Sequence, residues 1–533
     1  MPKLSPMNYA ALVNFYLVFT PTLLFSQSSQ NLELFGQFDR GDSYYSGSWG
    51  YTDFSARKEF ALLGTRTGTA IYAIDEQPVS ELAFIPGPVS NWREITVFDS
   101  YAYVITEGNG QGQGMQIINL SNLPDTAELV TTYSAAFGRA HMIQRDIYST
   151  DPYLYVTGTC GNCGIHILDI SDPVAPIEIG NYQPGYYIHD AHVRGNYLYA
   201  AAFYEGTIDI VDISDKLQPV LITRIEVPGG NTHSAWTTED EQFLIISNEK
   251  DGLPARIWNI ADLSNVYEVA TYIGNAASLT HNPYVRGDFV FFSHNTEGLR
   301  VVDVRDPALP VEVAYFDTYP GLSGGFRGLW SAYPYFPSGK IIGGNRENGL
   351  YVWNFNDSLA GRLYARVLDA ETYEMIKDAQ IFVLKKETLL HPDLSGKFRF
   401  GTLPGIFNLE VSAPGYKTTI LEVSLEAGAR LERDIALEPA SVNLFEPNRT
   451  LSEISLFPNP FSASAMIRLK DFKGADFFKI YDRKGRLLRT EYIHPGADLF
   501  IERKGLAEGL YFLCLFDRKG QLIAKTRFVL SVN

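Results

Sequence analysis

One short sequence recurs seven times in the first two thirds of the chain, and it constrains the fold more than any other feature. It is an apolar run that opens on a glycine and closes near an aspartate, as in residues 164–173 (GIHILDISDP) and 206–215 (GTIDIVDISD). The seven copies begin at Gly68, Gly114, Gly164, Gly206, Gly252, Gly298 and Gly349. The steps between them are 46, 50, 42, 46, 46 and 51 residues, and a period of this size is typical of a propeller or a solenoid.

Each repeat holds four short strands. In the fourth repeat we expect them at residues 177–182, 188–193, 196–203 and 207–213. The turns between the last two strands are polar and rich in glycine, as tight antiparallel hairpins require. Four such strands, repeated seven times, predict an all-β protein whose residues 31–356 form a seven-bladed β-propeller.

The two ends of this region complement each other. The last copy, residues 350–355, is not followed by an outer strand of the kind seen at 177–182 and 311–316. One such strand is spare at the beginning, at residues 32–38 (LELFGQF). We expect it to complete the last blade, because closing the ring removes an exposed sheet edge. In this register the strand at 188–193 and its equivalents are innermost and line the central channel.

The repeated motifs ILDIS, IVDIS and VVDVR resemble the LVIVD repeat. The larger unit, which includes GNCGIHILDISDP, is similar to the bacterial surface proteins called choice-of-anchor B. The resemblance covers residues 31–356. It implies that C-terminal anchoring modules differ between members, and it implies no established catalytic chemistry.

A second, smaller β domain is expected at residues 361–439, after a linker at 357–361. The segments GKFRF (396–400) and APGY (413–416) belong to a period-two pattern broken by Pro-Gly turns, which favours a small Ig-like β-sandwich. The pattern resembles the carboxypeptidase regulatory-like domain. That resemblance implies a spacer or binding module with no zinc peptidase site of its own.

Residues 440–453 form a polar linker, and residues 454–533 are expected to form a second small β-sandwich. The order of FPNPF (457–461), DRKGR (482–486), GLYFL (509–513) and a final lysine-bearing strand resembles the type A C-terminal sorting domain of the type IX secretion system. An ordinary terminal sandwich is the alternative. The resemblance implies type IX secretion machinery as a partner, removal of the domain, and release of the remainder or its attachment to surface glycolipid.

The first residues resemble a secretory signal peptide. Lys3 precedes an apolar stretch at 9–25, and small polar residues follow at 26–29, so we expect a signal peptide over residues 1–27. A membrane anchor is the alternative, which the short stretch interrupted by Pro21 disfavours. The sequence thus predicts an exported protein, secreted or at the cell surface in association with the outer membrane.

The net charge limits the classes of partner, and the cysteines limit the possible disulfides and metal sites. The formal net charge of −17 disfavours nucleic acid as a partner, because that would need a basic surface. In an exported protein the CGNC segment favours a local disulfide between Cys160 and Cys163, with free thiols, a metal or a redox role as alternatives. Cys514 is expected to be a single buried thiol, and the protein a monomer.

Four of the nine histidines occupy the same place in successive repeats: His141, His189, His233 and His281, spaced by 48, 44 and 48 residues. Arg93 fills this place in the second repeat, while Trp49 and Trp330 lie near it in the first and seventh. In a closed ring these side chains should converge on one channel mouth. The residues expected there are Arg93, His141, His189, Asp190, His192, His233, His281, Asn282 and Trp330.

Two interpretations of the histidines remain open. They could form a ligand or metal pocket, with His141, His189, His233 and His281 as candidate ligands for a divalent metal. They could instead be buried residues that join loops within each blade, which repetition in register favours. His166 and His294 are expected to be local hydrogen-bonding partners. No catalytic residue is assigned, and the absence of a cofactor is the first expectation.

The predicted function is that of an exported interaction protein whose propeller binds a protein, a glycan or a small ligand. The sequence contains no GxSxG, HExxH, P-loop or EF-hand motif, which favours a binding role over an enzyme. The alternative is an extracellular metal-assisted hydrolase or lyase that uses the histidine ring.

Overall fold

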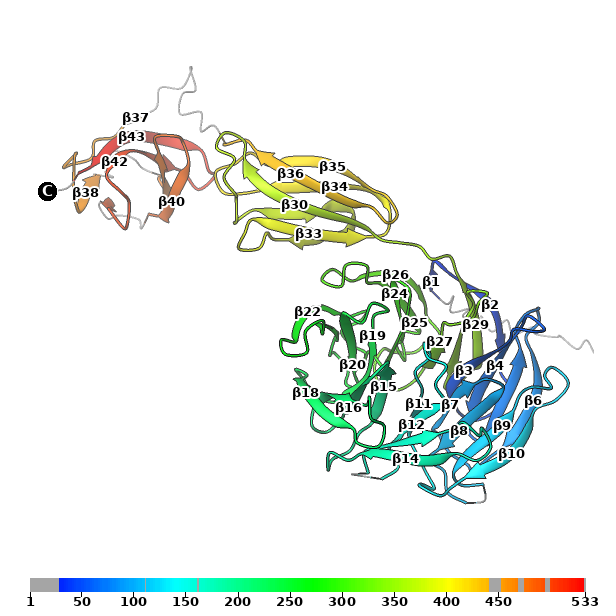
Figure 1. Ribbon diagram of the computed structural model, residues 1–533. Helices are drawn as coiled ribbons and strands as arrows, with labels where there is room; N and C mark the ends of the chain where they lie inside the picture. Colours follow the sequence, from blue (N-terminus) through cyan, green and yellow to red (C-terminus); the bar gives the residue numbers. More distant parts are fainter. Residues whose placement is uncertain are drawn as a thin grey trace, which may run out of the picture. The chain divides into compact units, whose positions relative to one another are not determined.

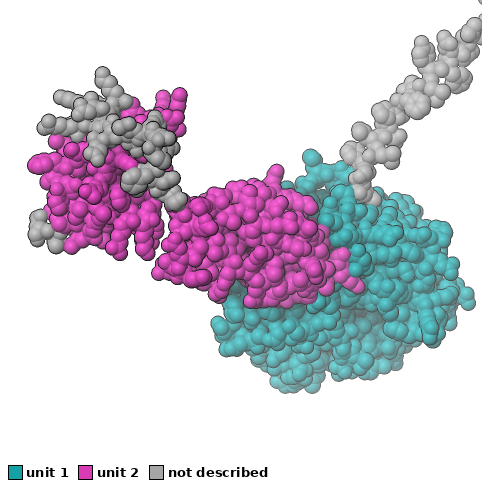
Figure 2. Space-filling model, turned by 90° about the horizontal axis from the view of Figure 1, so that it is seen from above, with its two compact units in different colours: residues 1–302, 314–356 teal, residues 303–313, 357–533 magenta. Residues whose placement is uncertain are grey.

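The computed structural model describes residues 28–110, 112–160, 163–440, 452–467, 474–493 and 499–531. The predicted signal peptide and most of the predicted linker at 440–453 lie outside this part of the chain. Within it the fold is all-β, and the helical structure is one 3-10 turn, η1 (Leu384–Lys386). No helix among the described residues is long and apolar enough to cross a membrane. The chain divides into two compact units, Met1–Val302 with Ala314–Asn356 and Asp303–Val313 with Asp357–Asn533 (Figure 2).

Residues 29–355 form seven antiparallel sheets, six with four strands and one with five, which is consistent with a propeller (Figure 1). The first strands are β3 (Tyr45–Asp53), β7 (Arg93–Phe98), β11 (Met142–Gln144), β15 (Asp190–Arg194), β19 (Thr232–Thr237), β23 (Asn282–Arg286) and β27 (Leu329–Tyr333). The second strands are β4 (Lys58–Thr65), β8 (Tyr101–Thr106), β12 (Tyr153–Thr157), β16 (Tyr197–Ala202), β20 (Phe243–Asn248), β24 (Phe289–Ser293) and β28 (Ile341–Asn345).

The repeated sequence forms the third strand of every sheet. These strands are β5 (Gly68–Ala73), β9 (Met115–Asn119), β13 (Ile165–Asp169), β17 (Thr207–Asp212), β21 (Ala255–Asn259), β25 (Leu299–Asp303) and β29 (Gly349–Phe355). The fourth, outer strands are β6 (Ser80–Pro86), β10 (Glu128–Tyr133), β14 (Ile177–Tyr182), β18 (Val220–Glu226), β22 (Tyr267–Tyr272), β26 (Val311–Phe316) and, for the last sheet, β2 (Leu32–Phe38).

The first strands close into a ring. Each of them contacts the first strand of the next sheet along the chain, and β27 contacts β3. The closing strand is the one expected from the sequence, because β2 pairs antiparallel with β29 in a register that places Leu32 opposite Phe355 and Phe38 opposite Leu350. A two-residue strand, β1 (Ser29–Gln30), pairs with β26.

The glycine that opens the repeat permits a close backbone approach. A Cβ atom on Gly164 would lie 1.8 Å from the carbonyl oxygen of Tyr182 on the outer strand. At Gly349 the same atom would lie 2.3 Å from the carbonyl oxygen of Phe38 on the closing strand. Both glycines have positive φ angles, 69° and 82°, which other residues rarely adopt. The repeat therefore needs glycine at this position.

The aspartate that closes the repeat forms the turn after the third strand. Oδ1 of Asp169 accepts the backbone N–H of Ser171 at 2.7 Å, and Oδ1 of Asp212 accepts that of Ser214 at 2.8 Å. This side-chain turn is a common way for Asp to end a strand. In the turn before β13, Cys160 and Cys163 are joined by a disulfide, with their Cα atoms 5.3 Å apart.

The second unit contains two separate hydrophobic cores. The first lies between the sheet of β30 (Gly361–Asp369), β33 (Lys397–Thr402) and β36 (Arg430–Leu437) and the sheet of β31 (Gln380–Val383), β32 (Thr388–Leu390), β34 (Gly405–Ser412) and β35 (Thr419–Leu425). The second core belongs to β37 (Ser452–Glu453), β38 (Ser464–Ile467), β39 (Phe477–Asp482), β40 (Leu487–Tyr492), β41 (Leu499–Glu502), β42 (Gly509–Phe516) and β43 (Leu522–Leu530). Cys514 is buried there, and burial raises the pKa of its thiol to about 11.

Candidate functional site

The four in-register histidines and Trp330 form one continuous row of contacting rings, called the stack below, in which neighbouring rings are tilted or edge-on to each other. The ring centroids of His141 and His189 lie 4.3 Å apart, those of His189 and His233 4.2 Å, and those of His233 and His281 4.4 Å. Trp330 ends the stack with its ring centroid 4.3 Å from that of His281. Each ring comes from a residue within one position of the start of a first strand, in successive sheets, so the register of the repeat brings these five side chains together.

Hydrogen bonds fix the tautomer of three histidines. Nδ1 of His189 lies 3.2 Å from the carbonyl oxygen of His233, and Nδ1 of His233 lies 3.2 Å from that of His281. Nδ1 of His281 lies 2.9 Å from the carbonyl oxygen of Trp330. A carbonyl oxygen only accepts hydrogen bonds, so each Nδ1 carries the proton and each Nε2 keeps a lone pair. These bonds also join each sheet to the next.

The stack is buried, and its central rings are neutral. His189, His233 and His281 expose 6%, 1% and 0% of their surfaces. Burial lowers the pKa of His281 to about 3 and holds the pKa values of His189 and His233 well below the ordinary value. In the part of the chain that the structure describes, Nε2 of His233 and Nε2 of His281 have no hydrogen-bonding partner.

Three glutamates that the sequence did not single out border the stack. Oε1 of Glu107 lies 2.7 Å from Nδ1 of His141, and Oε1 of Glu249 lies 3.7 Å from Nε2 of His233. At the other end, Trp330 donates its indole N–H to Oε1 of Glu94 at 2.9 Å. Both Glu107 and Glu249 directly follow a second strand, β8 and β20, and that shared position is the signal that could have revealed them.

Two of these glutamates, Glu94 and Glu249, and the histidine His141 have shifted pKa values. Burial raises the pKa of Glu94 and that of Glu249 to about 7. Burial alone would lower the pKa of His141, but the hydrogen bond to Glu107 and the charges of Glu94 and Glu249 outweigh it and raise the pKa. At one end of the stack, Glu107 therefore stabilises the charged form of His141, while the middle of the stack is neutral.

Two of the expected residues lie elsewhere. Arg93 is buried, but its guanidinium turns away from the stack and donates from Nε to the carbonyl oxygen of Thr65 at 3.2 Å and from a terminal nitrogen to that of Pro88 at 2.6 Å. Its neighbour Glu94 makes the contact with Trp330. Trp49 packs on Tyr333, with ring centroids 5.2 Å apart, among the residues that end the first strands.

The other expected residues support the stack or lie beyond it. Asn282 donates to the carbonyl oxygen of Trp330 at 3.5 Å, which His281 also contacts. Asp190 is buried, its carboxylate accepts the backbone N–H of Ala191, and burial raises its pKa. His192 lies in β15, three residues after His189, where its ring packs against Trp236 with centroids 4.4 Å apart.

His166 and His294, the two histidines expected to have local partners, do so. Nδ1 of His166 contacts Glu178 at 2.7 Å, from one strand to the next in the same sheet. Nδ1 of His294 lies 3.3 Å from Oγ of Ser278.

A hollow that the sequence did not predict lies where the first strands end, while the histidines lie where they begin. Its volume is about 810 Å³. The aromatic side chains that line it are Trp49, Tyr51, Phe54, Phe98, Tyr148, Tyr333 and Tyr335. Asp53, Asp99 and Arg145 lie among them. Phe54 is 78% exposed, so the hollow offers one freely accessible ring beside several that are largely covered.

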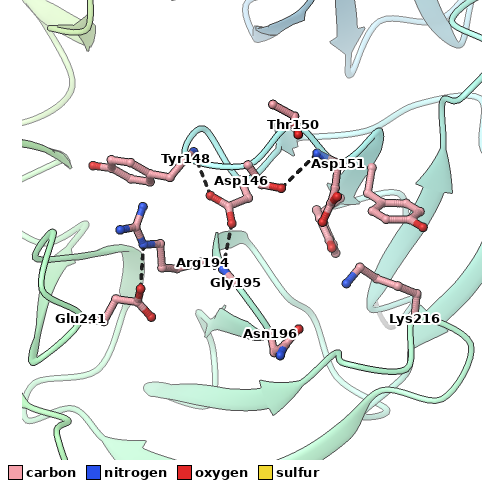
Figure 3. A pocket seen from close by; sticks show the side chains of 12 residues that line it. Asp146, Tyr148, Thr150, Asp151, Arg194, Gly195, Asn196, Lys216 and Glu241 are labelled. Carbon is pink, nitrogen blue, oxygen red and sulfur yellow. Dashed lines mark hydrogen bonds and ion pairs between the residues drawn. The ribbon is translucent and has the colours of Figure 1, made fainter.

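A second, more polar hollow of about 500 Å³ shares the segment 148–150 with the first (Figure 3). Tyr148 lies between the two hollows. Its hydroxyl donates to the carbonyl oxygen of Val285 at 3.3 Å, and the guanidinium carbon of Arg194 lies 3.6 Å above its ring. Asp146 holds the neighbouring backbone by accepting the N–H of Gly195 at 2.8 Å.

Two family models match the chain. The LVIVD repeat matches residues 145–183, 187–227 and 274–318, and the secretion system C-terminal sorting domain matches residues 455–529. The chain therefore carries LVIVD repeats and a type IX sorting domain, which indicates a secreted or cell-surface protein that interacts with the secretion machinery.

No curated protein matches the chain. Among solved structures, the computationally designed Ika8 protein aligns at 10% identity over 60% of this chain and 99% of its own, with a TM-score of 0.42.

Proposed function

We propose that this chain is an exported binding protein whose seven-bladed propeller recognises a glycan in the aromatic hollow where the first strands end. The location rests on the sorting domain at 455–529. A signal peptide at 1–27 would direct the first step of export, across the inner membrane. Residues 31–356 would form a choice-of-anchor B propeller, and 361–439 a carboxypeptidase regulatory-like, Ig-like spacer. Removal of the sorting domain would release the rest or leave it on surface glycolipid.

Seven blades are supported by seven sheets of four or five strands and by the ring of contacts between their first strands. The strand β2 completes the last sheet from the other end of the region. A ring closed in this way holds the ends of its first strands in fixed positions, and the loops that follow them can present a ligand site.

The aromatic hollow is the observation that carries the glycan proposal. Ligand sites are concave, and aromatic rings with a few polar groups are their usual lining. Sugar rings present C–H faces that stack on aromatic rings and hydroxyl groups that bond to carboxylates and guanidinium groups. Phe54 provides an exposed ring, and Asp53, Asp99 and Arg145 provide polar groups beside it.

A glycan and protein array probed with the full chain tests the proposal. We expect binding to a related set of glycans, and Phe54→Ala should weaken it about fivefold, because one stacking contact contributes about 1 kcal/mol. The matched control is Tyr204→Ala, since Tyr204 is an equally exposed aromatic residue, at 79% against 78%, outside the hollow. Binding to proteins alone, or equal losses in both variants, would contradict the proposal.

Export is tested separately in the native bacterium. Deletion of residues 455–533 should trap the remaining protein in the periplasm, because the signal for crossing the outer membrane is lost. Fractionation and immunoblotting would measure this. Surface exposure of the truncated chain would contradict the assignment of the route to the sorting domain.

A further inference from the structure

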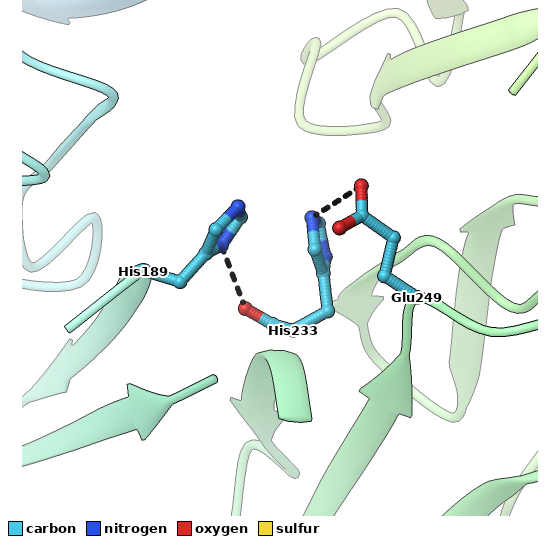
Figure 4. Close-up of side chains that lie close together, drawn as sticks. All are labelled: His189, His233 and Glu249. Carbon is cyan, nitrogen blue, oxygen red and sulfur yellow. Dashed lines mark hydrogen bonds and ion pairs between the residues drawn. The ribbon is translucent and has the colours of Figure 1, made fainter. Parts of the chain in front are cut away.

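Three ligand atoms in the middle of the stack lie close together. One imidazole nitrogen of His189, one of His233 and a carboxylate oxygen of Glu249 all lie within 4.8 Å of one another. The two rings project to the same side, and the carboxylate lies beside the ring of His233 (Figure 4). Two imidazoles and one carboxylate form a donor set that suits zinc and related transition metals.

The hydrogen bonds of the stack prepare these nitrogens for a metal. Metal-binding histidines normally donate the N–H of the other ring nitrogen to a carbonyl or a carboxylate, which fixes the tautomer and the orientation of the ring. In His189 and His233 that role falls to Nδ1, which faces a backbone carbonyl oxygen of the next sheet. The lone pairs on Nε2 are left for another partner.

The buried Nε2 atom of His233 points to an additional ligand. His233 is 1% exposed, and its Nε2 lacks a hydrogen-bonding partner within the described residues. A buried polar atom without a partner costs about 1–3 kcal/mol, so such atoms are uncommon and call for an explanation. A bound cation would satisfy this nitrogen.

The geometry requires only a small adjustment. Zinc binds nitrogen and oxygen at about 2.0–2.2 Å, so tetrahedral ligand atoms lie about 3.4 Å apart, less than the 4.8 Å limit that encloses the three atoms here. Glu249 directly follows β20, and its side chain is 16% exposed. Rotation of this side chain can bring its oxygen closer, and its exposure gives an ion a path from solvent.

We propose that Nε2 of His189, Nε2 of His233 and the carboxylate of Glu249 bind one divalent transition metal ion, with Zn²⁺ the ion that fits best. A fourth position remains for water or an exogenous ligand, as in zinc sites with three protein ligands. The histidines then have two roles on different atoms: Nδ1 joins the sheets, and Nε2 binds the metal. None of the three ligands lines either hollow, so this site and the proposed glycan site are independent.

Metal titration of the full chain tests the site. The protein is stripped with a chelator, and ZnCl₂ is added in a calorimeter. We expect one equivalent to bind and to raise the Tm, because a ligand that binds the folded state stabilises it. Co²⁺ should bind with the intense visible absorption of a four-coordinate site. No binding by the folded, stripped protein would overturn the proposal.

Two variants separate metal binding from folding. In His233→Asn the amide N–H replaces Nδ1 toward His281 while Nε2 is lost, and Glu249→Gln removes a charge from a partly exposed position. Each should weaken Zn²⁺ binding by about 100-fold or more, with the metal-free Tm of Glu249→Gln no lower than that of the wild type.

Glu107→Gln is the matched control. Glu107 also follows a second strand and contacts the stack, but its partner is His141 rather than the proposed ligands. The affinity of the Glu107→Gln protein for Zn²⁺ should stay close to that of the wild type. Unchanged affinity in Glu249→Gln, or an equal loss in Glu107→Gln, would overturn the assignment of the three ligands.

Discussion

Trp330 donates its indole N–H to Oε1 of Glu94 at 2.9 Å, although the two residues are 236 positions apart in the chain. The bond runs from β27 of the last sheet to β7 of the second and passes the intervening strand β3 of the first. The bond can cross β3 because residue 47 is a glycine and has no side chain there. A Cβ atom on Gly47 would lie 2.3 Å from Oε2 of Glu94 and 2.6 Å from the carbonyl oxygen of Arg93. A missing side chain in one sheet thus lets its two neighbours meet.

The first prediction follows from that space. Gly47→Ala forces β3 or β7 to shift, because the new methyl group meets backbone as well as the Glu94 carboxylate. We expect a loss of about 2–3 kcal/mol, the usual cost of overpacking. The Tm of the repeat domain measures it. Gly405→Ala, in β34 outside the repeat domain, is the control and should leave the Tm of the repeat domain unchanged, since the nearest contact of its new methyl group is an ordinary 3.4 Å from Phe407. A Gly47→Ala protein as stable as the control would contradict the prediction.

The second prediction concerns pH. Burial raises the pKa of Glu94 from 4.5 to about 7, so the folded state disfavours the charged form. The wild type should therefore lose stability as the pH rises from about 4.5 to about 7. Glu94→Gln stays neutral and can still accept the Trp330 N–H. It should be about 2 kcal/mol more stable than the wild type at pH 8 and nearly equal to it at pH 4.5.

Urea unfolding at the two pH values checks this difference. Glu205→Gln, a substitution of an exposed glutamate, is the control and should show no such dependence. A stability gain in Glu94→Gln that is the same at both pH values would rule out titration of Glu94 as the cause.

The third prediction concerns a buried charge in β17. Asp209 has no exposed side-chain surface, and it accepts hydrogen bonds from the Tyr182 hydroxyl and from Nε of Arg224, both at 2.7 Å. Asp209→Ala should cost about 3 kcal/mol, because it leaves these donors without their acceptor. The side chain of Arg224 is 36% exposed and can turn to solvent. The double variant Asp209→Ala/Arg224→Ala should thus lose no more than Asp209→Ala alone, and additive losses would count against coupling of the pair.

The fourth prediction concerns ring closure. Deletion of residues 28–38 removes β2 and exposes the edge of β29. We expect the Tm to fall by about 10 °C or more, and light scattering to reveal self-association through the open edge. Deletion of residues 28–30 removes only β1 and should have a much smaller effect. Equal Tm values for the two deletions would show that β2 does not close the ring.

The repeat allowed much of the fold to be predicted. Gly164 and Asp169 mark the ends of a third strand because each meets a local requirement, a positive φ angle or a side-chain turn. Such requirements recur at the same place in most of the repeats, so they identify the strands and the register. The register in turn predicted that β2 pairs with β29 and that His141, His189, His233 and His281 lie near one another.

Positions outside the repeated pattern could not be predicted in the same way. Arg93 shares the register of the histidines, yet its longer side chain reaches the carbonyl oxygens of Thr65 and Pro88. Glu94 meets Trp330 only because Gly47 of another sheet leaves room. No regular spacing in the sequence indicates that these three residues from different sheets meet.

By itself the sequence determined the number of repeats, their strand order, the strand that closes the ring and the row of histidines, because each depends on local backbone requirements repeated along the chain. The tertiary structure decided which nitrogen of each histidine is bonded, which glutamates border the stack and where the aromatic hollow lies. These depend on side chains from different sheets that meet in space. Their distances and burial follow from the closed packing of the whole ring.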